Sequence, residues 1–310
     1  MLWLTFLIAF GLDAILGDPH SKWHPVALFG TLAAKTETTC REYFGNTVFA
    51  GALGWFLLVG GCTAAAWLAG MLTGYIGAGV ILYCCIALRS LIDHALAIIR
   101  PLEKGDLPSA RRALGMVVSR DTSALDESGI IRGGVESLGE NLIDAVNSAV
   151  FWAMLGDVFF GAPGAAAGAV LLRTVNTLDA CWGYRNSRYL QFGKVAARTD
   201  DFMHWLPARL TALAVAIASG RFMRTLRTAW KHRHDHPSPN SCWGMAAFAG
   251  ALGIRLGGPT TYHDGTEAYP YWGDGRAVLR ANDLRRAIYL GILSAAIFLV
   301  LAGLLIFCVK

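Results

Sequence analysis

Long uninterrupted apolar stretches are the feature that most constrains the fold of this chain. Residues 48–70, 71–88 and 287–309 are each long enough to be helices that span the hydrocarbon core of a bilayer, which takes about 20 apolar residues. Residues 1–16 are a shorter candidate, and we expect a retained helix because the stretch lacks a basic n-region and contains Asp13. Only 16% of the residues are charged, against roughly 25% in soluble domains. We predict an all-α, polytopic integral membrane protein.

Two further apolar stretches are interrupted. Residues 143–172 are broken by the sequence GAPG at 161–164, and residues 206–220 are short and carry Arg209. Each is expected to form a half-helix, a re-entrant hairpin or a buried interface helix, and whether 206–220 crosses the membrane stays open. Because no internal repeat or low-complexity linker is evident, we expect residues 1–310 to form one membrane domain with polar helical segments and loops on the cytoplasmic side.

The distribution of basic residues predicts the orientation. The net charge is +5, and lysines and arginines gather in residues 89–132, 173–209 and 221–286, which the positive-inside rule places in the cytoplasm. Acidic residues are interleaved with them and no nucleic-acid motif is present, so we expect no nucleic-acid partner. The densest run, WKHRHDHP at 230–237, is interpreted as a solvated basic loop, with metal binding by its histidines as the alternative. The seven cysteines show no ligand spacing and predict packing residues, not a disulfide or zinc framework.

The sequence ESLGENLIDAVN, residues 136–147, places an acidic stripe on a predicted amphipathic helix. Glu136, Glu140 and Asp144 recur every four residues and therefore share one helix face. Mg²⁺, which proteins hold with one or two carboxylates plus substrate phosphates, would offset their repulsion. A solvated face with salt bridges to Arg120 or Arg132 is the alternative, and spacing alone does not decide between the two.

Arginines and carboxylates recur in the next polar segment, residues 173–209. Arg173, Asn176 and Asp179 are spaced three apart, and arginines 185, 188, 198 and 209 and the pair Asp200–Asp201 follow. Arginine forks match phosphate oxygens, and carboxylates hold the metal that phosphates need. The segment therefore suggests a nucleotide or a phosphorylated substrate, although a web of interhelical ion pairs would explain some of these residues.

Smaller motifs flank these segments. SRDT at 119–122, GDPHSKWHP at 17–25 and SPN at 238–240 each combine turn residues with polar side chains, and GALGIRLGGP at 250–259 predicts a helix followed by a turn. The standard phosphate-binding and hydrolase motifs are absent from the sequence. Any nucleotide is therefore expected to bind in an unfamiliar arrangement.

Taken in order, the motifs GDPHSKWHP, SRDT, ESLGEN, NTLDACWGYRN, FGKVAARTDD, WLPARLT, HPSPNS and GALGIRLGGPTTY resemble the CobD/CbiB family of cobalamin biosynthesis, the adenosylcobinamide-phosphate synthases, over about residues 11–275. The resemblance implies a multi-pass enzyme of the bacterial inner membrane with a cytoplasmic active site. It would use ATP and Mg²⁺ to join a corrinoid substrate, adenosylcobyric acid, to aminopropanol or its phosphate. Its other partners would be membrane lipid and other cobalamin-assembly enzymes.

The chain departs from the family pattern at three places, one of which is the small-residue pair that often follows SPN and is Ser241 and Cys242 here. His204 stands where the pattern usually has asparagine, so an essential base is not expected there. Gly244 and Met245 stand where many relatives carry a carboxylate after SPN, so no role of that carboxylate transfers to this chain.

Site residues follow from the acidic stripe, the arginines and the resemblance together. Mg²⁺ is assigned to Glu136, Glu140 and Asp144, with Asp179 and Asp201 as second candidates. Glu140 and Asp144 are also the principal catalytic candidates, and Asp18 and His24 are the candidates for the base that deprotonates the amine. Contacts to substrate or phosphate are expected from Arg120, Asp121, Asn141, Arg173, Asn176, Tyr184, Arg198, Arg209, Ser238 and Asn240.

Two rival functions use similar residue types. A prenyltransferase-like membrane enzyme also binds Mg²⁺ and diphosphate through acidic helical motifs, but it would show aspartate-rich pairs instead of ExxxENxxD. A transporter or non-catalytic sensor would place carboxylates deep in spanning helices and show paired repeats. Substrate-dependent ATP consumption separates an enzyme from a transporter.

Overall fold

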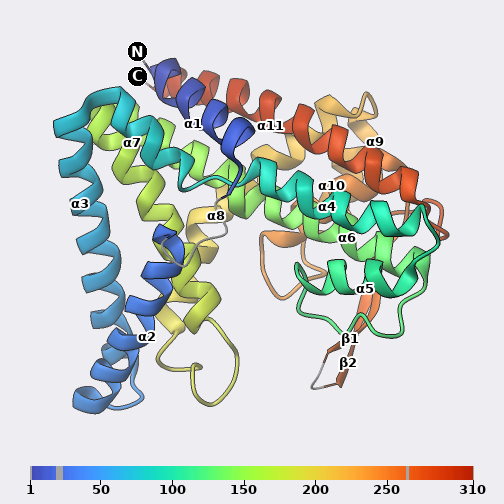
Figure 1. The fold of residues 1–310 in the computed structure, drawn as a ribbon, viewed down its shortest axis with the longest axis horizontal. Helices are drawn as coiled ribbons and strands as arrows, with labels where there is room; N and C mark the ends of the chain where they lie inside the picture. The colour runs from blue at the N-terminus through green and yellow to red at the C-terminus, as the bar shows by residue number, and fades with distance from the viewer. Residues whose placement is uncertain (1, 19–23, 263–264, 310) are drawn as a thin grey trace. The chain divides into compact units, whose positions relative to one another are not determined.

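The computed structural model describes residues 2–18, 24–262 and 265–309. Over these residues the chain is helical apart from one two-stranded hairpin and the connecting loops, which confirms the predicted fold class (Figure 1). Three helical stretches among them are long and apolar enough to cross a membrane: Val48–Leu102, Glu127–Trp182 and Ala281–Leu304. The chain divides into two compact units, which are described separately.

Unit 1 comprises residues up to Ala87, Asp144–His204 and the residues from Ala302 onward. Its elements are α1 (Leu2–Leu16), α2 (Pro25–Phe44), α3 (Val48–Tyr83), most of a π-helical turn η1 (Ile143–Asn147), α7 (Ser148–Trp182) and the first part of α8 (Lys194–Ala218). Helices α3 and α7 pack side by side (Figure 1). Gly74, at a φ of 62°, breaks α3 into two helices, so the predicted boundary between residues 70 and 71 lies a few residues too early.

Helix α7 folds back on itself at GAPG, as the interruption predicted. Gly161 has a φ of 66°, a backbone conformation that glycine adopts without strain, and Pro163 follows it. The two halves then pack with their backbones in contact, because a Cβ at Gly156 would lie 2.0 Å from the carbonyl oxygen of Gly164. Small residues permit this close approach of apolar helices. Of the three forms expected for this stretch, the structure shows a helical hairpin.

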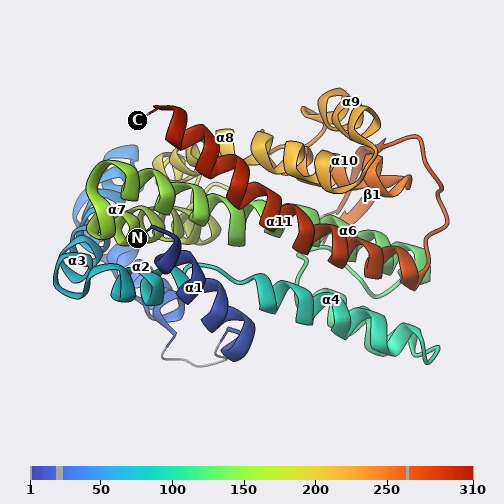
Figure 2. The ribbon, with the colours of Figure 1, turned by 90° about the horizontal axis from the view of Figure 1, so that it is seen from above.

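Unit 2 comprises Leu88–Ile143 and Trp205–Leu301. Its elements are α4 (Leu88–Leu102), α5 (Leu107–Gly115), α6 (Glu127–Leu142), the remainder of α8, α9 (Phe222–His232), α10 (Ser241–Leu252), strands β1 (Leu256–Tyr262) and β2 (Gly265–Trp272), and α11 (Ala281–Val309) as far as Leu301. Every residue of α10 is buried. Helix α10 contacts α6 and α9, and Figure 2 shows α9 beside α10. Gly139 and Gly244 allow the backbones of α6 and α10 to touch.

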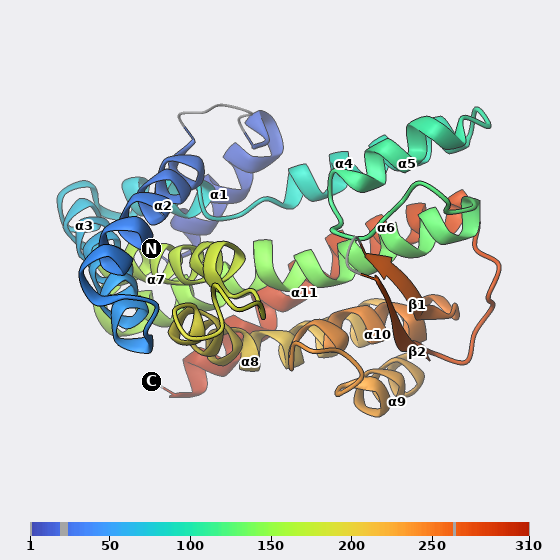
Figure 3. The same ribbon diagram turned by 90° about the horizontal axis from the view of Figure 1, so that it is seen from below.

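The antiparallel hairpin of β1 and β2 is the part of the fold that the sequence did not predict. Its register shifts between Gly257 and Pro259, and Gly257 and Gly258 both have positive φ, so the strand begins with a glycine-rich irregularity. Glycine and proline weaken a strand pattern, which is why LGGP at 256–259 indicated a turn. Strand β1 contacts α6 and α10 (Figure 3).

Two other helices are longer than predicted. Residues 206–218 are the second part of α8, which runs from Lys194 through an internal Pro207 to Ala218 and ends two residues before the predicted stretch does. Helix α11 begins at Ala281, six residues before the predicted start, because the polar sequence ANDLRR forms its first turns.

Candidate functional site

Helix α6 positions two of the three carboxylates of the predicted acidic stripe in unit 2. The side chain of Asp126 caps the helix by accepting a hydrogen bond of 2.7 Å from the backbone nitrogen of Gly129. One helical turn separates Glu136, which is 2% exposed, from the half-buried Glu140. Asp144 follows in η1 and belongs to unit 1.

Both carboxylate oxygens of Glu136 are engaged by the protein. Nη2 of Arg120 lies 2.6 Å from Oε2, and the backbone nitrogen of Gly257 donates to Oε1 over 2.6 Å. Arg132 donates to the carbonyl oxygen of the same glycine over 3.2 Å. The salt bridge to Arg120 that was weighed as an alternative to metal binding is therefore present, and Glu136 holds the start of β1 against α6.

Glu140 offers a more accessible carboxylate. The hydroxyl of Ser241, the first residue of α10, donates to its Oε1 over 2.8 Å, and among the described residues its Oε2 has no hydrogen-bond partner. Ser238 shapes the turn before α10, since its hydroxyl oxygen accepts from the backbone nitrogens of Asn240 and Ser241 over 3.3 and 3.4 Å. Asn141 instead donates back to the carbonyl oxygen of Ser137.

Arg209 and Asn240, which were both predicted as binding residues, meet in unit 2. Nη1 of Arg209 donates to Oδ1 of Asn240 over 3.0 Å and to the carbonyl oxygen of Trp205 over 2.6 Å. The guanidinium carbon lies 4.3 Å from the ring centre of Trp205 and 5.0 Å from that of Trp243. A guanidinium has five N–H donors, so the remaining ones are available to an anion. Asp121 forms a turn in which its Oδ1 accepts from the backbone nitrogen of Ser123.

His236, one of the three histidines that the sequence offered as alternative metal ligands, also lies in this region. Its ring stacks on Tyr269 with centroids 5.7 Å apart and meets Trp272 edge-on, and its Nδ1 accepts from the backbone nitrogen of Ser238. Burial lowers the pKa of His236, although Glu140 and Glu136 oppose the shift. Both aromatic partners lie on the unpredicted hairpin, so no local pattern predicted this packing of His236.

The interpretation of residues 230–237 as a solvated loop is wrong in part, because residues 230–232 are the end of α9 and His232 is buried. His232 is 6% exposed and its Nδ1 lies 2.7 Å from Oδ2 of Asp235. His234 is exposed, whereas His236 is half-buried. The burial follows from packing of α9 on α10, which composition does not reveal.

Unit 1 holds a second cluster of charged residues, centred on His204. This side chain is 1% exposed, with Nε2 3.6 Å from Oδ1 of Asp144 and Nδ1 3.2 Å from Oδ1 of Asp200. Burial alone lowers the pKa of His204, but Asp144 and the hydrogen bond with Asp200 raise it, to about 9. Two carboxylates on one buried imidazole favour its protonated form. His204 therefore places a positive charge between two acidic residues.

Arg173 and Asn176 connect to this cluster through hydrogen bonds. Arg173 donates to the backbone carbonyl oxygens of Cys85 and Ala145, and its Nη1 lies 3.4 Å from Oδ1 of Asn176. Asn176 donates to Oδ1 of Asp200 over 3.3 Å. These contacts match the alternative in which part of the segment is an internal polar network, and they tie α7 to α8.

The second-ranked metal residues lie near the same cluster. Asp179 is within electrostatic range of Asp200, Asp201 and His204. Burial and then the neighbouring Asp200 raise the pKa of Asp201, and Arg198 lowers it. Arg198 and Tyr184 are exposed, and the Tyr184 ring lies 5.9 Å from that of Tyr189.

Glu37 is a buried acidic residue of α2 that the sequence did not indicate. Its carboxylate accepts from Arg41 over 2.8 Å, from Arg188 over 2.8 and 3.0 Å and from the hydroxyl of Tyr189 over 3.2 Å. Arg41 also donates to the carbonyl oxygen of Arg188. The loop between α7 and α8, which carries Tyr184, is thereby tied to α2.

His24 has a local structural role in unit 1. Its Nδ1 accepts from the backbone nitrogen of Val26 at the start of α2, and its Nε2 lies 3.1 Å from Oδ1 of Asp18. In the neutral ring the proton must then lie on Nε2 and point at Asp18, which leaves no lone pair for an amine proton. The assignment of Asp18 and His24 as base stays a prediction. Residues 19–23 of this motif lie outside the described residues.

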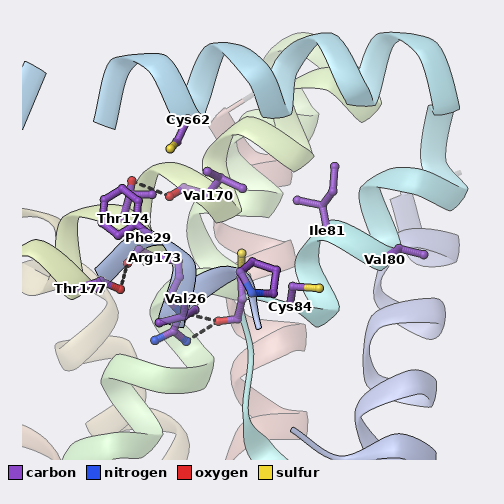
Figure 4. Close-up of a pocket in the computed structure, with 12 residues that line it drawn as sticks. Val26, Phe29, Cys62, Val80, Ile81, Cys84, Val170, Arg173, Thr174 and Thr177 are labelled. Atoms are coloured by element: carbon purple, nitrogen blue, oxygen red, sulfur yellow. Dashed lines mark hydrogen bonds between the residues drawn. The ribbon is translucent and has the colours of Figure 1, made fainter. Parts of the chain in front are cut away.

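An apolar pocket of about 260 Å³ lies among α2, α3 and α7 of unit 1 (Figure 4). Its walls include Val26, Phe29, Ile81 and Val170. The hydroxyl of Thr174, at its edge, donates to its own helix. The largely apolar walls suit an aliphatic group; the guanidinium of Arg173 also lines the pocket and donates to the carbonyl oxygens of Cys85 and Ala145.

The arrangement of the carboxylates limits which of them could bind Mg²⁺. Over the residues that the structure describes, no three His, Cys, Asp or Glu side chains are grouped to hold a metal ion. Mg²⁺ commonly takes one or two carboxylates and completes its shell with water and substrate phosphates. Glu140 fits that pattern better than Glu136, whose oxygens are already paired. The assignments to Glu136, Asp144, Asp179 and Asp201 stay predictions.

Comparisons with known proteins agree on one family. The family model described as "CobD/Cbib protein" matches residues 6–291. A protein of Stutzerimonas stutzeri named "Cobalamin biosynthesis protein CobD" is 44% identical over 278 residues, covering 88% of each chain. One of Clostridium perfringens with the same name is 35% identical, covering 91% of this chain and 90% of the relative. A Salmonella typhimurium protein named "Cobalamin biosynthesis protein CbiB" is 38% identical, covering 93% and 92%. No solved structure matches the chain.

Proposed function

The chain belongs to the CobD/CbiB family of cobalamin biosynthesis proteins, and from that membership we propose that it forms an amide bond between adenosylcobyric acid and aminopropanol or its phosphate, using ATP and Mg²⁺. The observation that carries the proposal is the match over residues 6–291 to a family whose relatives are named for cobalamin biosynthesis. The cluster of unit 2 supports it by supplying a carboxylate, a guanidinium and an amide in one unit.

Amide formation from a carboxylate requires activation, because an amine cannot displace oxide. Transfer of the terminal phosphoryl group of ATP to the corrinoid carboxylate would give an acyl phosphate and ADP. Attack by the neutral amine would then form the amide and release phosphate and a proton. Phosphoryl transfer depends mainly on positioning and on neutralising charge.

The residues of unit 2 have separate parts in this proposal. Glu140 would hold Mg²⁺, which supplies charge neutralisation at the phosphates when it is bound. Arg209, stacked between two tryptophans and oriented by Asn240, would contact phosphate or carboxylate oxygens. Glu136 would act indirectly, by fixing Arg120 and the start of β1 beside Glu140.

The proposal is tested with purified protein in detergent. ATP use is followed with adenosylcobyric acid and with aminopropanol or its phosphate in turn, with and without Mg²⁺, and products are identified by mass spectrometry. We expect ATP use to require Mg²⁺ and both substrates and to yield ADP and an amide. AMP and diphosphate would instead indicate adenylation, and ATP use without an amide would favour the transporter.

Two matched variants test the role of Glu140. Glu140→Gln keeps the shape and the contact with Ser241 but removes the negative charge, so activity should fall by at least about tenfold at saturating substrate, the effect of losing roughly 1.4 kcal/mol of transition-state stabilisation. Glu127→Gln, on the exposed first turn of the same helix, should keep near-normal activity. Equal activities of the two folded variants would reject Glu140 as a magnesium ligand.

A further inference from the structure

Helix α9 is packed on only one of its faces. Thr225, Ala229 and His232 are buried, and Thr225 lies against Gly250 of α10, where a Cβ would come within 2.9 Å of the threonine backbone. Figure 2 shows α9 at the margin of unit 2, beside α10. The remaining faces of α9 carry large apolar and basic side chains side by side, which is not typical of a helix face that contacts only water.

An apolar strip runs along one of these faces. Phe222, Leu226 and Trp230 follow one another at intervals of four residues, and Met223 lies beside them on the helix surface. The side chains of Phe222, Met223 and Trp230 are 42%, 57% and 61% exposed. The packing of α9 on α10 involves its buried face, so it does not account for these four further large apolar side chains.

A basic strip lies directly beside the apolar one. Arg227 and Lys231 follow each other at an interval of four residues next to Met223 and Trp230, and Arg224 borders them. All three are exposed, and the only ion pair of Lys231 among the described residues is a 3.6 Å surface contact with Asp274, which contributes little. Residues 221–234 contain no aspartate or glutamate.

The two strips meet at Trp230. The guanidinium carbon of Arg233 lies 4.1 Å from the centre of the Trp230 ring, which makes edge contact with Trp243. Tryptophan rings with an apolar body and a polar edge gather at membrane–water interfaces, where arginine reaches lipid phosphates. A helix with aromatic and apolar residues on one strip and Lys/Arg on the next is typical of helices that lie in the plane of such an interface.

We propose that α9 lies flat in the headgroup layer of an anionic phospholipid bilayer, with Phe222, Met223 and Trp230 inserted at the acyl boundary and Arg224, Arg227 and Lys231 against lipid phosphates. Charge complementarity selects the anionic lipid, because an uncharged surface would satisfy the apolar strip but would give no counterion to Arg224 and Arg227 and would leave Lys231 with only its surface contact to Asp274. The docking does not depend on the ligase activity proposed above.

The test is hydroxyl-radical footprinting of the full-length protein in nanodiscs. One set contains phosphatidylcholine alone and the other a mixture of phosphatidylcholine and phosphatidylglycerol, and oxidation of Met223 and Trp230 is read by mass spectrometry. Met116, which is 80% exposed just after α5, is the internal control for radical dose. We expect oxidation of Met223 and Trp230, relative to Met116, to fall severalfold in the anionic nanodiscs only.

Charge variants make the test specific. Arg227→Gln with Lys231→Gln should weaken docking by about fivefold for each lost cation and restore oxidation of Met223. Lys104→Gln with Arg112→Gln removes two exposed cations elsewhere in unit 2 and should leave the protection unchanged. The proposal is overturned if Met223 and Trp230 are oxidised to the same extent in both kinds of nanodisc, whether or not they are protected relative to Met116. Protection that appears in detergent and grows with protein concentration also overturns it, in favour of a second copy of the chain.

Discussion

Replacing Glu136 by glutamine should lower the stability of unit 2 and have little direct effect on ligand contacts. The side chain is 3% exposed and pairs with Arg120, which is 18% exposed, at 2.6 Å. Glutamine keeps an oxygen for the Gly257 N–H but leaves the guanidinium without its counterion. Removing one partner of a buried pair costs roughly 3–5 kcal/mol, and the partial exposure of Arg120 places the expected cost near the lower end, about 3 kcal/mol. At about 2–4 °C per kcal/mol, the thermal midpoint should fall by roughly 6–12 °C.

The assay is thermal unfolding in detergent, applied to a double-mutant cycle. Glu136→Gln and Arg120→Gln are measured singly and together, and because the double variant leaves no charge unpaired, its loss should be smaller than the sum by about 1 kcal/mol or more. Additive losses would refute the buried pair as the source of stability. A midpoint of Glu136→Gln within about 1 °C of the original, together with lost activity, would show instead that Glu136 contacts a ligand.

Two further predictions concern packing and pH. Gly156→Ala places a methyl group 2.0 Å from the facing backbone oxygen of the α7 hairpin and should lower the free energy of unfolding by roughly 1–3 kcal/mol or more. The control Gly60→Ala, whose methyl group meets nothing within 4 Å, should be neutral or slightly stabilising. Equal thermal midpoints for the two variants would contradict the close packing of the hairpin. Burial lowers the pKa of His236 below its unfolded value of 6.5, so its contribution is complete above pH 6.5 and is lost as the pH falls from there through the folded pKa. His236→Gln should flatten the dependence of the midpoint on pH below 6.5, whereas His234→Gln, at an exposed position, should not.

The candidate site was predictable where its residues form local patterns. The four-residue spacing of the acidic stripe correctly placed Glu136 and Glu140 on one face of a helix, and the family motifs pointed to Arg209 and Asn240, which the fold brings together. Which carboxylate stays accessible was not predictable. That depends on Gly257, whose N–H reaches Glu136 from 121 residues away in the sequence.

His204 illustrates the same limit. From the sequence it was a departure from the family pattern with no expected role, and in the fold it is a buried imidazole between Asp144 and Asp200. Asp200 lies one helical turn away and could have been found by its spacing, but Asp144 is brought there only by the packing of unit 1.

The sequence by itself determined the membrane class, the helical fold, the break of α7 at Gly161 and the family. Each of these depends on something local: the length of an apolar run, a glycine that tolerates positive φ followed by a proline, or an ordered set of short motifs. Only the tertiary structure decided the β-hairpin, the partners of Glu136 and Glu140 and the free strips of α9. These depend on which segments distant in the sequence come into contact, and a side chain's pairing and exposure are set by those neighbours and not by its own pattern.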